Sequence, residues 1–420
     1  MSSLSYTVIS CCRICGGTEL APVLDLGEQM LTGVFPRTRD ECVTIGPLRL
    51  VKCMGDQACG LLQLEHSFDL GEMYGDNYGY RSGLNQSMVL HLREKVRRIA
   101  HWVDLHEGDL VLDIGSNDGT TLAAYPAAGL DLLGIDPTAR KFREYYPDHV
   151  DLVADFFSAA VVHASRPGKQ ARVVTSFSML YDLESPLQFM REIHEVLADD
   201  GVWVFEQSYM PAMLEMNAYD TVCHEHLEYY ALRQVKWMVD RAGFRIIDVE
   251  FNDINGGSFS VTVAKTASGL PESNDLVRVL QHEVDLGLDT LAPYQAFAAR
   301  VAASRQELRD FTDRARREGR KLAALGASTK GNVLLQYCGL DSGAVAVVGE
   351  VNPEKYGCYT PGTWIPIRPE SEVLASKPDY LVVLPWHFRA FFLGNARFAG
   401  MRLLFPLPKL EVVQVAEVGE

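Results

Sequence analysis

A glycine-rich turn beside an acid is the stretch of this sequence that is best suited to hold a ligand. The apolar run Leu110 to Ile114 predicts a buried strand, which leads through Gly115 and Gly119 into a helix expected to begin near Thr120. Glycine permits a tight turn and a close approach of the backbone to a ligand. The first amides of the helix offer hydrogen-bond donors, and Asp113 offers an acceptor.

A second acid follows at the end of the next predicted strand, Leu132 to Asp136, 23 positions after Asp113. An acid about 20 residues beyond the first turn is suited to bind the two hydroxyls of a ribose. Asp155 and Phe156 follow a third predicted strand, where an adenine edge would lie. The pattern therefore predicts a nucleoside-containing cofactor, and an ordinary turn with an unrelated aspartate is the alternative.

The glycine spacing narrows the kind of cofactor. The three-glycine dinucleotide fingerprint is incomplete, and no Gly-Lys-Ser/Thr of a P-loop follows. The stretch resembles motif I of the class I S-adenosyl-L-methionine (SAM) methyltransferases. That resemblance implies a SAM site made of Asp113, Gly115, Asn117, Gly119, Asp136, Asp155, Phe156 and Ser178.

Four cysteines near the N-terminus have a spacing that suits a metal. Cys12 and Cys15 form a C-x2-C pair followed by two glycines, and Cys53 and Cys59 form a wider C-x5-C pair. Four thiolates in a tetrahedron suit structural zinc, and the metal would supply folding energy to a segment with little core of its own. Buried, unpaired thiols are the alternative.

The segment Tyr219 to Tyr230 combines two histidines, three acids and three tyrosines, which is too polar for a core helix. Histidine exchanges protons near neutral pH, and a neighbouring carboxylate can orient its ring. His224 and His226 would face the same way in an extended segment and opposite ways on a helix. Their spacing is not that of the H-E-x-x-H zinc helix. We expect an acid–base site here, with a packed or surface histidine pair as the alternative.

Two other stretches predict contacts with a substrate. The polar, tyrosine-rich loop 74–88 precedes an amphipathic helix that runs to about Ala100, and it could line a pocket or serve as a packed connector. Near the C-terminus, Ser328, Thr329 and Lys330 lie in a glycine turn between a predicted strand and a helix. Small hydroxyls, free amides and a cation at a helix start suit an anion such as a diphosphate.

Composition limits the function classes. The 420 residues carry a formal net charge of -16, which argues against binding to the phosphate backbone of a nucleic acid. No signal peptide or membrane-length apolar run is evident in the sequence, and nine cysteines in such a chain read as reduced thiols and metal ligands. We therefore expect a cytoplasmic protein.

The order of predicted elements indicates an α/β protein with a class I SAM methyltransferase Rossmann-like domain, a small N-terminal zinc-binding domain and a second, C-terminal Rossmann-like domain. The expected boundaries are 1–70 for the zinc-binding domain, 71–265 for the SAM-binding domain, 266–318 for a helical connector with a break at Pro293, and 319–420 for the C-terminal domain.

In this order, the motifs resemble those of the sugar C-methyltransferases of deoxysugar biosynthesis. The resemblance covers nearly the whole chain. It rests on Cys12-x2-Cys15-Gly-Gly, Tyr78 to Ser82, the turn from Asp113 to Gly119, Glu225-His226, Gly256-Gly-Ser258, Gly326 to Lys330, and Pro361-Gly-x-x-Ile-Pro366. Members of this family methylate carbon 3, or carbon 5 in some branches, of a nucleotide-linked 4-keto-6-deoxysugar.

The family likeness implies residue roles as well. His226 would be the base that removes the proton next to the ketone, Glu225 its partner or a contact of a sugar hydroxyl, and Tyr78 or Tyr80 a donor near the keto oxygen. The sugar would be linked to dTDP or GDP, and the protein would be a monomer or a homodimer. The implied substrate contacts are Arg81, Ser82, Asn85, Tyr181, Tyr230, Ser328, Thr329, Lys330, Asn332 and Lys355.

Two departures from the family pattern concern the enolate that this chemistry forms. Cys223 stands where relatives often carry a tyrosine, and Tyr181-Asp182 stands where some carry a histidine. His224 or Tyr181 could fill the missing donor role. Two other functions stay open, namely a SAM methyltransferase that acts on oxygen or nitrogen of another small molecule, and a zinc- and nucleotide-binding scaffold without catalysis.

Overall fold

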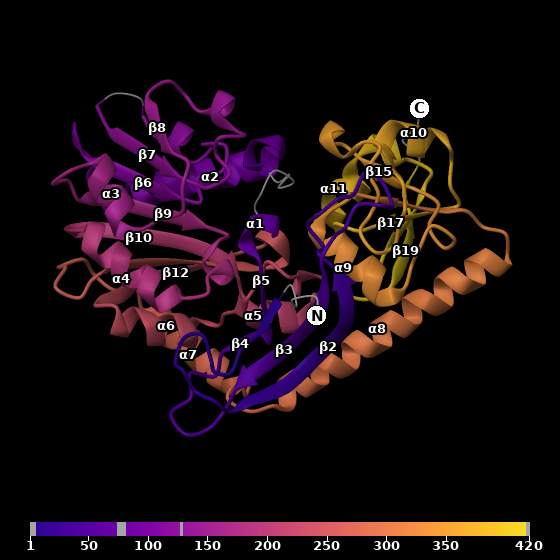
Figure 1. The fold of residues 1–420 in the computed structure, drawn as a ribbon, viewed down its shortest axis with the longest axis horizontal. Coiled ribbons are helices and arrows are strands. Elements are labelled where there is room, and N and C mark those ends of the chain that lie inside the picture. Colours follow the sequence, from indigo (N-terminus) through magenta and orange to yellow (C-terminus); the bar gives the residue numbers. More distant parts are fainter. Residues whose placement is uncertain (1–5, 74–80, 127–128, 417–420) are drawn as a thin grey trace.

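The structure is a computed structural model that describes residues 6–73, 81–126 and 129–416. Two α/β units stand side by side, one built around residues 110–265 and one around residues 322–414, and the N-terminal strands lie below and between them (Figure 1). The fold class expected from the sequence is confirmed.

The N-terminal lobe is an antiparallel sheet that is completed from a distant part of the chain. Its strands, in the order β11-β4-β3-β2, are β2 (Leu20–Met30), β3 (Ile45–Cys53), β4 (Leu62–Leu64) and β11 (Glu228–Tyr229). A smaller sheet pairs β1 (Tyr6–Val8) with β5 (His66–Phe68), and α1 (Leu70–Met73) follows. Since β11 belongs to the histidine-containing segment, that segment is anchored to the N-terminal lobe through Glu228, opposite Gln63.

The central sheet has the strand order β12-β13-β10-β9-β6-β7-β8. The parallel strands are β6 (Leu110–Ile114), β7 (Asp131–Ile135), β8 (Val150–Val153), β9 (Ala171–Phe177) and β10 (Leu197–Ser208). The antiparallel strands are β12 (Phe244–Asn252) and β13 (Ser258–Lys265). Chain order reverses between β6 and β9, and ligands of open α/β sheets bind at the carboxyl ends of the strands at such a point.

Helices of this unit include α2 (Gln86–Ile99), α3 (Ala159–Ser165), α4 (Pro186–Val196), α5 (Met210–Glu215) and α6 (Leu232–Arg241). The prediction of a helix that begins near Thr120 is wrong, because the described chain there forms a single 3-10 turn, Leu122–Ala124. Tyr125 is extended, with φ −75° and ψ 153°, and it precedes Pro126. A residue before proline avoids the helical region, so the helix cannot continue.

The C-terminal unit repeats the architecture on a smaller scale, in the order β16-β15-β14-β17-β18-β19. Its strands are β14 (Leu322–Leu325), β15 (Val348–Glu350), β16 (Ile367–Pro369), β17 (Tyr380–Val383), β18 (Arg402–Phe405) and the antiparallel β19 (Glu411–Gln414). Its helices are α9 (Thr329–Cys338), α10 (Glu370–Ala375) and α11 (Arg389–Gly394). Chain order reverses here between β14 and β17.

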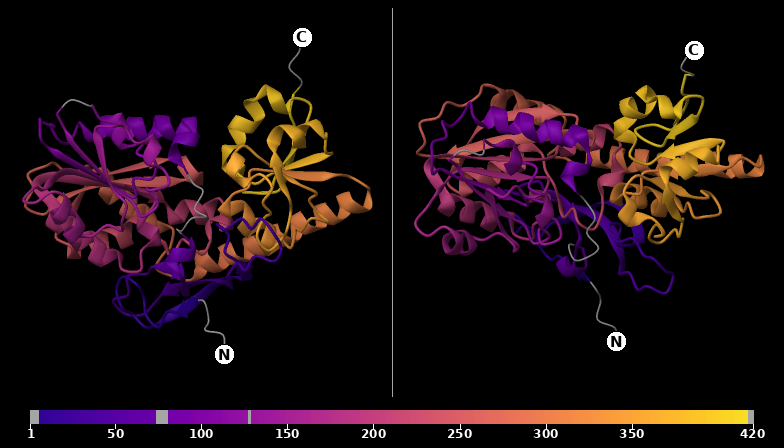
Figure 2. Two further views of the ribbon diagram at one scale, coloured as in Figure 1. Left: turned by 45° about the horizontal axis from the view of Figure 1, so that its top comes forward. Right: turned by 90° about the horizontal axis from the view of Figure 1, so that it is seen from above.

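Helices α7 (Asp275–Asp285) and α8 (Ala292–Arg317) link the two units. The break between them lies before Pro293, which occupies the first turn of α8, where its missing N–H costs no hydrogen bond. Helix α8 packs against α5, β2 and α9, so it contacts all three parts of the molecule (Figure 2). In the described part of the chain, no helix combines the length and the apolar character needed to cross a membrane.

Helix α9 also binds the end of the N-terminal sheet directly. The Gln336 side-chain amide accepts a hydrogen bond from Met30 N (2.8 Å) and donates one to Met30 O (3.1 Å). Asn332 Nδ2 donates to Thr32 O over 2.7 Å. Because α9 begins at the Ser328–Lys330 turn, these bonds place that turn next to residues 32 and 33.

Candidate functional site

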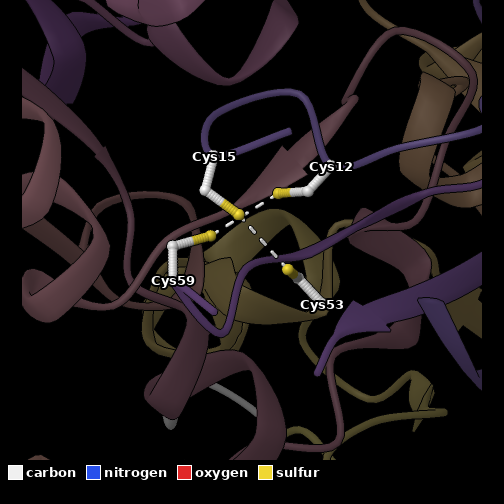
Figure 3. Close-up of side chains that lie close together, drawn as sticks. All are labelled: Cys12, Cys15, Cys53 and Cys59. Atoms are coloured by element: carbon white, nitrogen blue, oxygen red, sulfur yellow. Dashed lines mark hydrogen bonds between the residues drawn. The ribbon is translucent and has the colours of Figure 1, made fainter. Parts of the chain in front are cut away.

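The four predicted zinc ligands come together, although they lie on two separate segments of the chain. The sulfur atoms of Cys12, Cys15, Cys53 and Cys59 all lie within 4.8 Å of one another (Figure 3). Cys12 is 3.5 Å from Cys59, and Cys15 is 3.4 Å from Cys53. The hydrogen bond between the Cys12 and Cys59 thiols lowers the pKa of Cys12 to about 5. Four convergent thiols fit tetrahedral zinc and leave no ligand position open.

A cradle of left-handed residues forms the predicted SAM turn. Gly115, Asn117 and Gly119 have φ values of 71°, 50° and 76°. Asp136, at the end of β7, accepts a hydrogen bond from Asn117 N at 2.8 Å. Asp113 is buried, accepts a hydrogen bond from Thr175 Oγ1 at 2.5 Å, and has a pKa that burial raises to about 7. Turn amides and two acids at neighbouring strand ends fit the polar groups of SAM.

The other residues predicted to bind SAM lie at the same edge of the sheet. Ser178 follows β9 with a φ of 55°, and its N–H donates to Glu206 O. Asp155 and Phe156 follow β8 and are exposed, so both side chains are free to meet a cofactor.

The described part of the predicted substrate loop lies on the SAM turn. Ser82 N donates to Asn117 Oδ1 at 3.0 Å, and the Arg81 guanidinium stacks on the Tyr145 ring at 3.9 Å. Asn85 caps α2 by accepting a hydrogen bond from the N–H of Ser87. Tyr78 and Tyr80, the predicted catalytic tyrosines, fall outside the described residues.

His226 is held in one defined proton state. Its Nδ1 is 2.8 Å from the carbonyl oxygen of Thr221, so Nδ1 carries the proton and Nε2 keeps a free lone pair. The Tyr181 ring packs edge-on against the imidazole, with 4.5 Å between centroids. Burial and the charge of Lys330 lower the pKa of His226 to about 4. A small cavity beside His226 is lined also by Tyr181, Ser208, Thr221, Glu228 and Tyr229.

His224 and Glu225 point into the N-terminal lobe. The segment turns between them and His226, as the bond from His226 N to Cys223 O shows. His224 is fully buried, edge-on to Phe68 at 4.6 Å, and its Nε2 is 3.4 Å from Gly46 O. Glu225 is 3.5 Å from Thr32 Oγ1 and packs tightly on Gly33, where an added Cβ would lie 2.2 Å from its carboxylate. The two histidines therefore occupy different environments.

The C-terminal turn brings its predicted residues to the same place. Ser328 Oγ caps α9 by accepting a bond from Gly331 N at 3.1 Å. Thr329 Oγ1 is 3.6 Å from the Cβ position of Gly33, so it lies beside Glu225. Lys330 Nζ donates to Asn255 O at 3.0 Å, and Lys355 Nζ donates to Ala327 O at 2.7 Å. Lys355 and Asn332 thus hold the turn in position.

Asp220, Trp386 and His387 also reach this site, and the sequence predicted no individual role for any of them. Trp386 Nε1 donates to Asp220 Oδ2 at 2.9 Å, and His387 follows Trp386 in the loop after β17. Trp386 and His387 could have been predicted from their position just after the carboxyl end of a strand. Tyr230, in contrast, is 1% exposed and does not line the cavity; Tyr229 does.

Comparisons with known proteins match each part of the chain. A zinc binding domain model matches residues 12–74, a methyltransferase domain model matches 87–249, and a C-methyltransferase C-terminal domain model matches 253–408. The chain is 29% identical over 410 residues to the C-methyltransferase NovU of Streptomyces niveus, with 96% of each chain covered.

Two solved structures are similar to less than half of the chain. One is a methyltransferase in complex with the Trm112 activator of Haloferax volcanii, with a TM-score of 0.35, 14% identity, and coverage of 44% of this chain and 94% of that chain. The other is the CcbJ methyltransferase of Streptomyces caelestis, with a TM-score of 0.33, 15% identity, and coverage of 42% and 90%.

Proposed function

Because the chain belongs to the family of SAM-dependent sugar C-methyltransferases, we propose that it methylates the carbon next to the ketone of a nucleotide-linked 4-keto-6-deoxysugar. Carbon 3 is the proposed position, and dTDP or GDP the proposed nucleotide. The observation that carries this proposal is His226, which lines a small cavity and whose Nδ1–H is bonded to Thr221 O, so that Nε2 is the unprotonated nitrogen.

The proposed base is neutral at physiological pH. Burial, then the charge of Lys330, lowers the pKa of His226 to about 4, so its imidazole is ready to accept a proton at pH 7. The Thr221 carbonyl fixes the tautomer, and the Tyr181 ring fixes the ring plane. A positioned histidine of this kind contributes about 10²–10⁴-fold to the rate of proton transfer.

Glu225 is the proposed contact of a sugar hydroxyl or the partner of the base. Burial raises its pKa, which favours a protonated carboxyl group that can donate a hydrogen bond. SAM, when bound, supplies an electrophilic methyl group to the carbon that has lost its proton. Arg81, Ser82 and Tyr181 are proposed to border the space between cofactor and sugar, with Tyr78 or Tyr80 as donors.

The proposed role of the zinc site is structural and not catalytic. Its four thiolates satisfy a tetrahedral ion, and the lobe that they hold together presents Thr32 and Gly33 to Glu225. The metal would therefore shape one wall of the substrate site without touching the reacting atoms.

Methyl-labelled SAM and a panel of dTDP- and GDP-linked sugars, in 4-keto and reduced forms, test the proposal by mass spectrometry and carbon-13 spectra. A gain of one methyl on carbon that requires the 4-keto form is the expected result. Transfer only to reduced sugars, or a methyl on oxygen or nitrogen, would contradict it and favour a heteroatom methyltransferase.

A further inference from the structure

The crevice between β14 and β17 is the place where the C-terminal sheet would bind a ligand, and it faces His226 here. The loops after these strands touch, because a Cβ on Gly326 would lie 2.8 Å from the Pro385 ring. Asp220, in the segment Tyr219–Thr221, accepts a hydrogen bond from Trp386 Nε1 in one of these loops at 2.9 Å, and the next residue, Thr221, accepts one from His226 Nδ1 at 2.8 Å. A crevice of this type is thereby turned towards the base of another unit.

Polar side chains in this crevice have hydrogen-bonding capacity that the described residues do not use. Lys330 Nζ donates to Asn255 O, and among the described residues no other acceptor is recorded for its two remaining N–H groups. Asp220 Oδ1 and His387 Nδ1 are buried and have no hydrogen-bond partner in the described structure. Unpaired polar groups in such a place cost free energy, which is recovered when a ligand binds them.

The bond to Asn255 O places Lys330 in this crevice, because the adjacent Gly256 has Trp386 and His387 at 3.7 and 3.8 Å from its Cβ position. The charge of Lys330 contributes, after burial, to the lowered pKa of both His226 and His387. Burial lowers the pKa of Lys330 itself, and Asp220 opposes that shift. The buried thiol of Cys223 is also near, but a thiol is a weak hydrogen-bond donor. Lys330 is thus the strong donor beside His226 in the described part of the site.

We propose that Lys330 binds the carbonyl oxygen of the substrate and stabilises the enolate that forms there, which rests on the proposed function. His226 Nε2 takes the proton from the carbon next to the ketone. The electron pair of the broken C–H bond forms the C=C bond, and the C=O π pair moves to oxygen. The negative charge on that oxygen is paired with the ammonium of Lys330, and no other reactant is needed for this step.

A cation near the base has two opposite effects on the rate of proton abstraction. Whether the rate falls or rises when Lys330 is removed therefore tests the proposal. Lys330 weakens His226 as a base by repelling the imidazolium that forms. It lowers the barrier only if its N–H groups contact the oxygen. Removing one donor to such an oxyanion typically reduces turnover about 10²–10³-fold. Removing a cation that is merely nearby would leave turnover unchanged or increase it.

The measurement is deuterium exchange at the carbon next to the ketone, in D₂O without SAM, together with steady-state methyl transfer. Lys330→Met is compared with Lys330→Arg and with Lys321→Met, a change at an exposed lysine. We expect Lys330→Met to slow exchange and kcat about 100-fold, with KM and SAM affinity within threefold. Lys330→Arg should retain part of the exchange, and Lys321→Met should match the wild type.

Other outcomes overturn the inference in distinguishable ways. A raised KM with unchanged kcat would assign Lys330 to the diphosphate instead. If Lys330→Met exchanges deuterium as fast as the wild type or faster, Lys330 does not contact the carbonyl oxygen. If the wild-type protein exchanges and methylates no keto sugar, the proposed function itself fails. Thermal unfolding and SAM titration of each variant separate these results from misfolding.

Discussion

The two glycine turns, Gly115–Gly119 after β6 and Gly326–Lys330 after β14, share a backbone design and differ in charge. Each lies where the strand order reverses. In each, an acid at the end of the neighbouring strand accepts a turn N–H at 2.8 Å, from Asn117 to Asp136 and from Ala327 to Glu350. The strand before the first turn carries the buried acid Asp113 one residue before its end, whereas the second turn carries Lys330. The shared device shapes the turn, and the side chain placed on it selects the ligand.

The turns also differ in what covers them. Residues 81–83 of the same unit lie over the first turn, with Gly83 N donating to Asp118 Oδ2 at 2.8 Å. The second turn meets other parts of the chain, since Lys330 bonds to Asn255 and Thr329 lies beside Gly33. A cofactor site can therefore form within one unit, whereas the site around His226 needs all three.

The largest expected effect tests whether His226, in the site that the second turn helps to form, is the base. His226→Asn should reduce methyl transfer about 10³-fold, because it removes the proposed base. SAM affinity, which depends on the first turn, should stay within twofold by calorimetry. His101→Asn, at an exposed position, is the matched control. Turnover within tenfold of the wild type would remove His226 from the role of base.

Alanine substitutions compare the packing of the two turns. Gly326→Ala should lower the free energy of unfolding by about 1–2 kcal/mol for the left-handed backbone and about 1–3 kcal/mol more for the contact with the Pro385 ring. Gly357 has a similar φ of 79° and open space around it, so Gly357→Ala isolates the backbone cost. At Gly115 an added Cβ meets flexible Met179 at 3.3 Å, and the extra cost should be smaller.

Urea unfolding measures these differences directly. Equal losses for Gly326→Ala and Gly357→Ala would contradict the tight contact between the two C-terminal loops.

The pH dependence of stability should have opposite signs for Asp113, beside the first turn, and for His226, in the site that the second turn helps to form. The pKa of His226 falls from 6.5 to about 4 on folding, so the unfolded chain binds more protons and stability falls as pH drops through that window. At pH 5 one such histidine costs about 2 kcal/mol. The pKa of Asp113 rises to about 7, so its contribution is lost as pH rises from 3.8 through 7.

Urea unfolding between pH 5 and 7.5 checks both signs. His387→Gln, which removes a neighbour whose pKa is lowered to about 3 by burial and by Lys330, should reduce the loss on the acid side. Asp113→Asn should steepen the rise of stability with pH over the same range, because the opposing loss caused by Asp113 is removed. A steeper rise in His387→Gln, or a flatter one in Asp113→Asn, would break the contrast.

The smallest expected effect concerns the acids at the neighbouring strand ends. Asp136→Ala should weaken SAM binding about tenfold, near 1.4 kcal/mol, because the ribose loses an acceptor and Asn117 loses its anchor. Glu350→Ala should leave SAM affinity within twofold, because Glu350 holds the second turn. Equal effects in calorimetric titrations would show that the two turns are not separate in function.

Local patterns predicted much of this architecture. The Asp113 turn, the paired cysteines and the strand before Ser328 are short-range features, since strand, glycine and helix signals lie within a few residues of one another. The helix expected at Thr120 was wrong, although Pro126 carried the signal against it. The diphosphate role of Ser328 and Thr329 stays a prediction.

The sequence by itself predicted the three kinds of unit, the four-cysteine cluster and the glycine turn after β6, because each rests on motifs whose residues lie within a few positions of one another. Only the tertiary structure decided that the segment 219–230 lies against both the N-terminal lobe and the C-terminal unit, through Glu225 on Thr32 and Asp220 on Trp386. This arrangement depends on β11 joining the N-terminal sheet and on α9 binding residues 30–33. Such long-range packing leaves no local pattern, so the composition of a site formed by three units cannot be read from neighbouring residues.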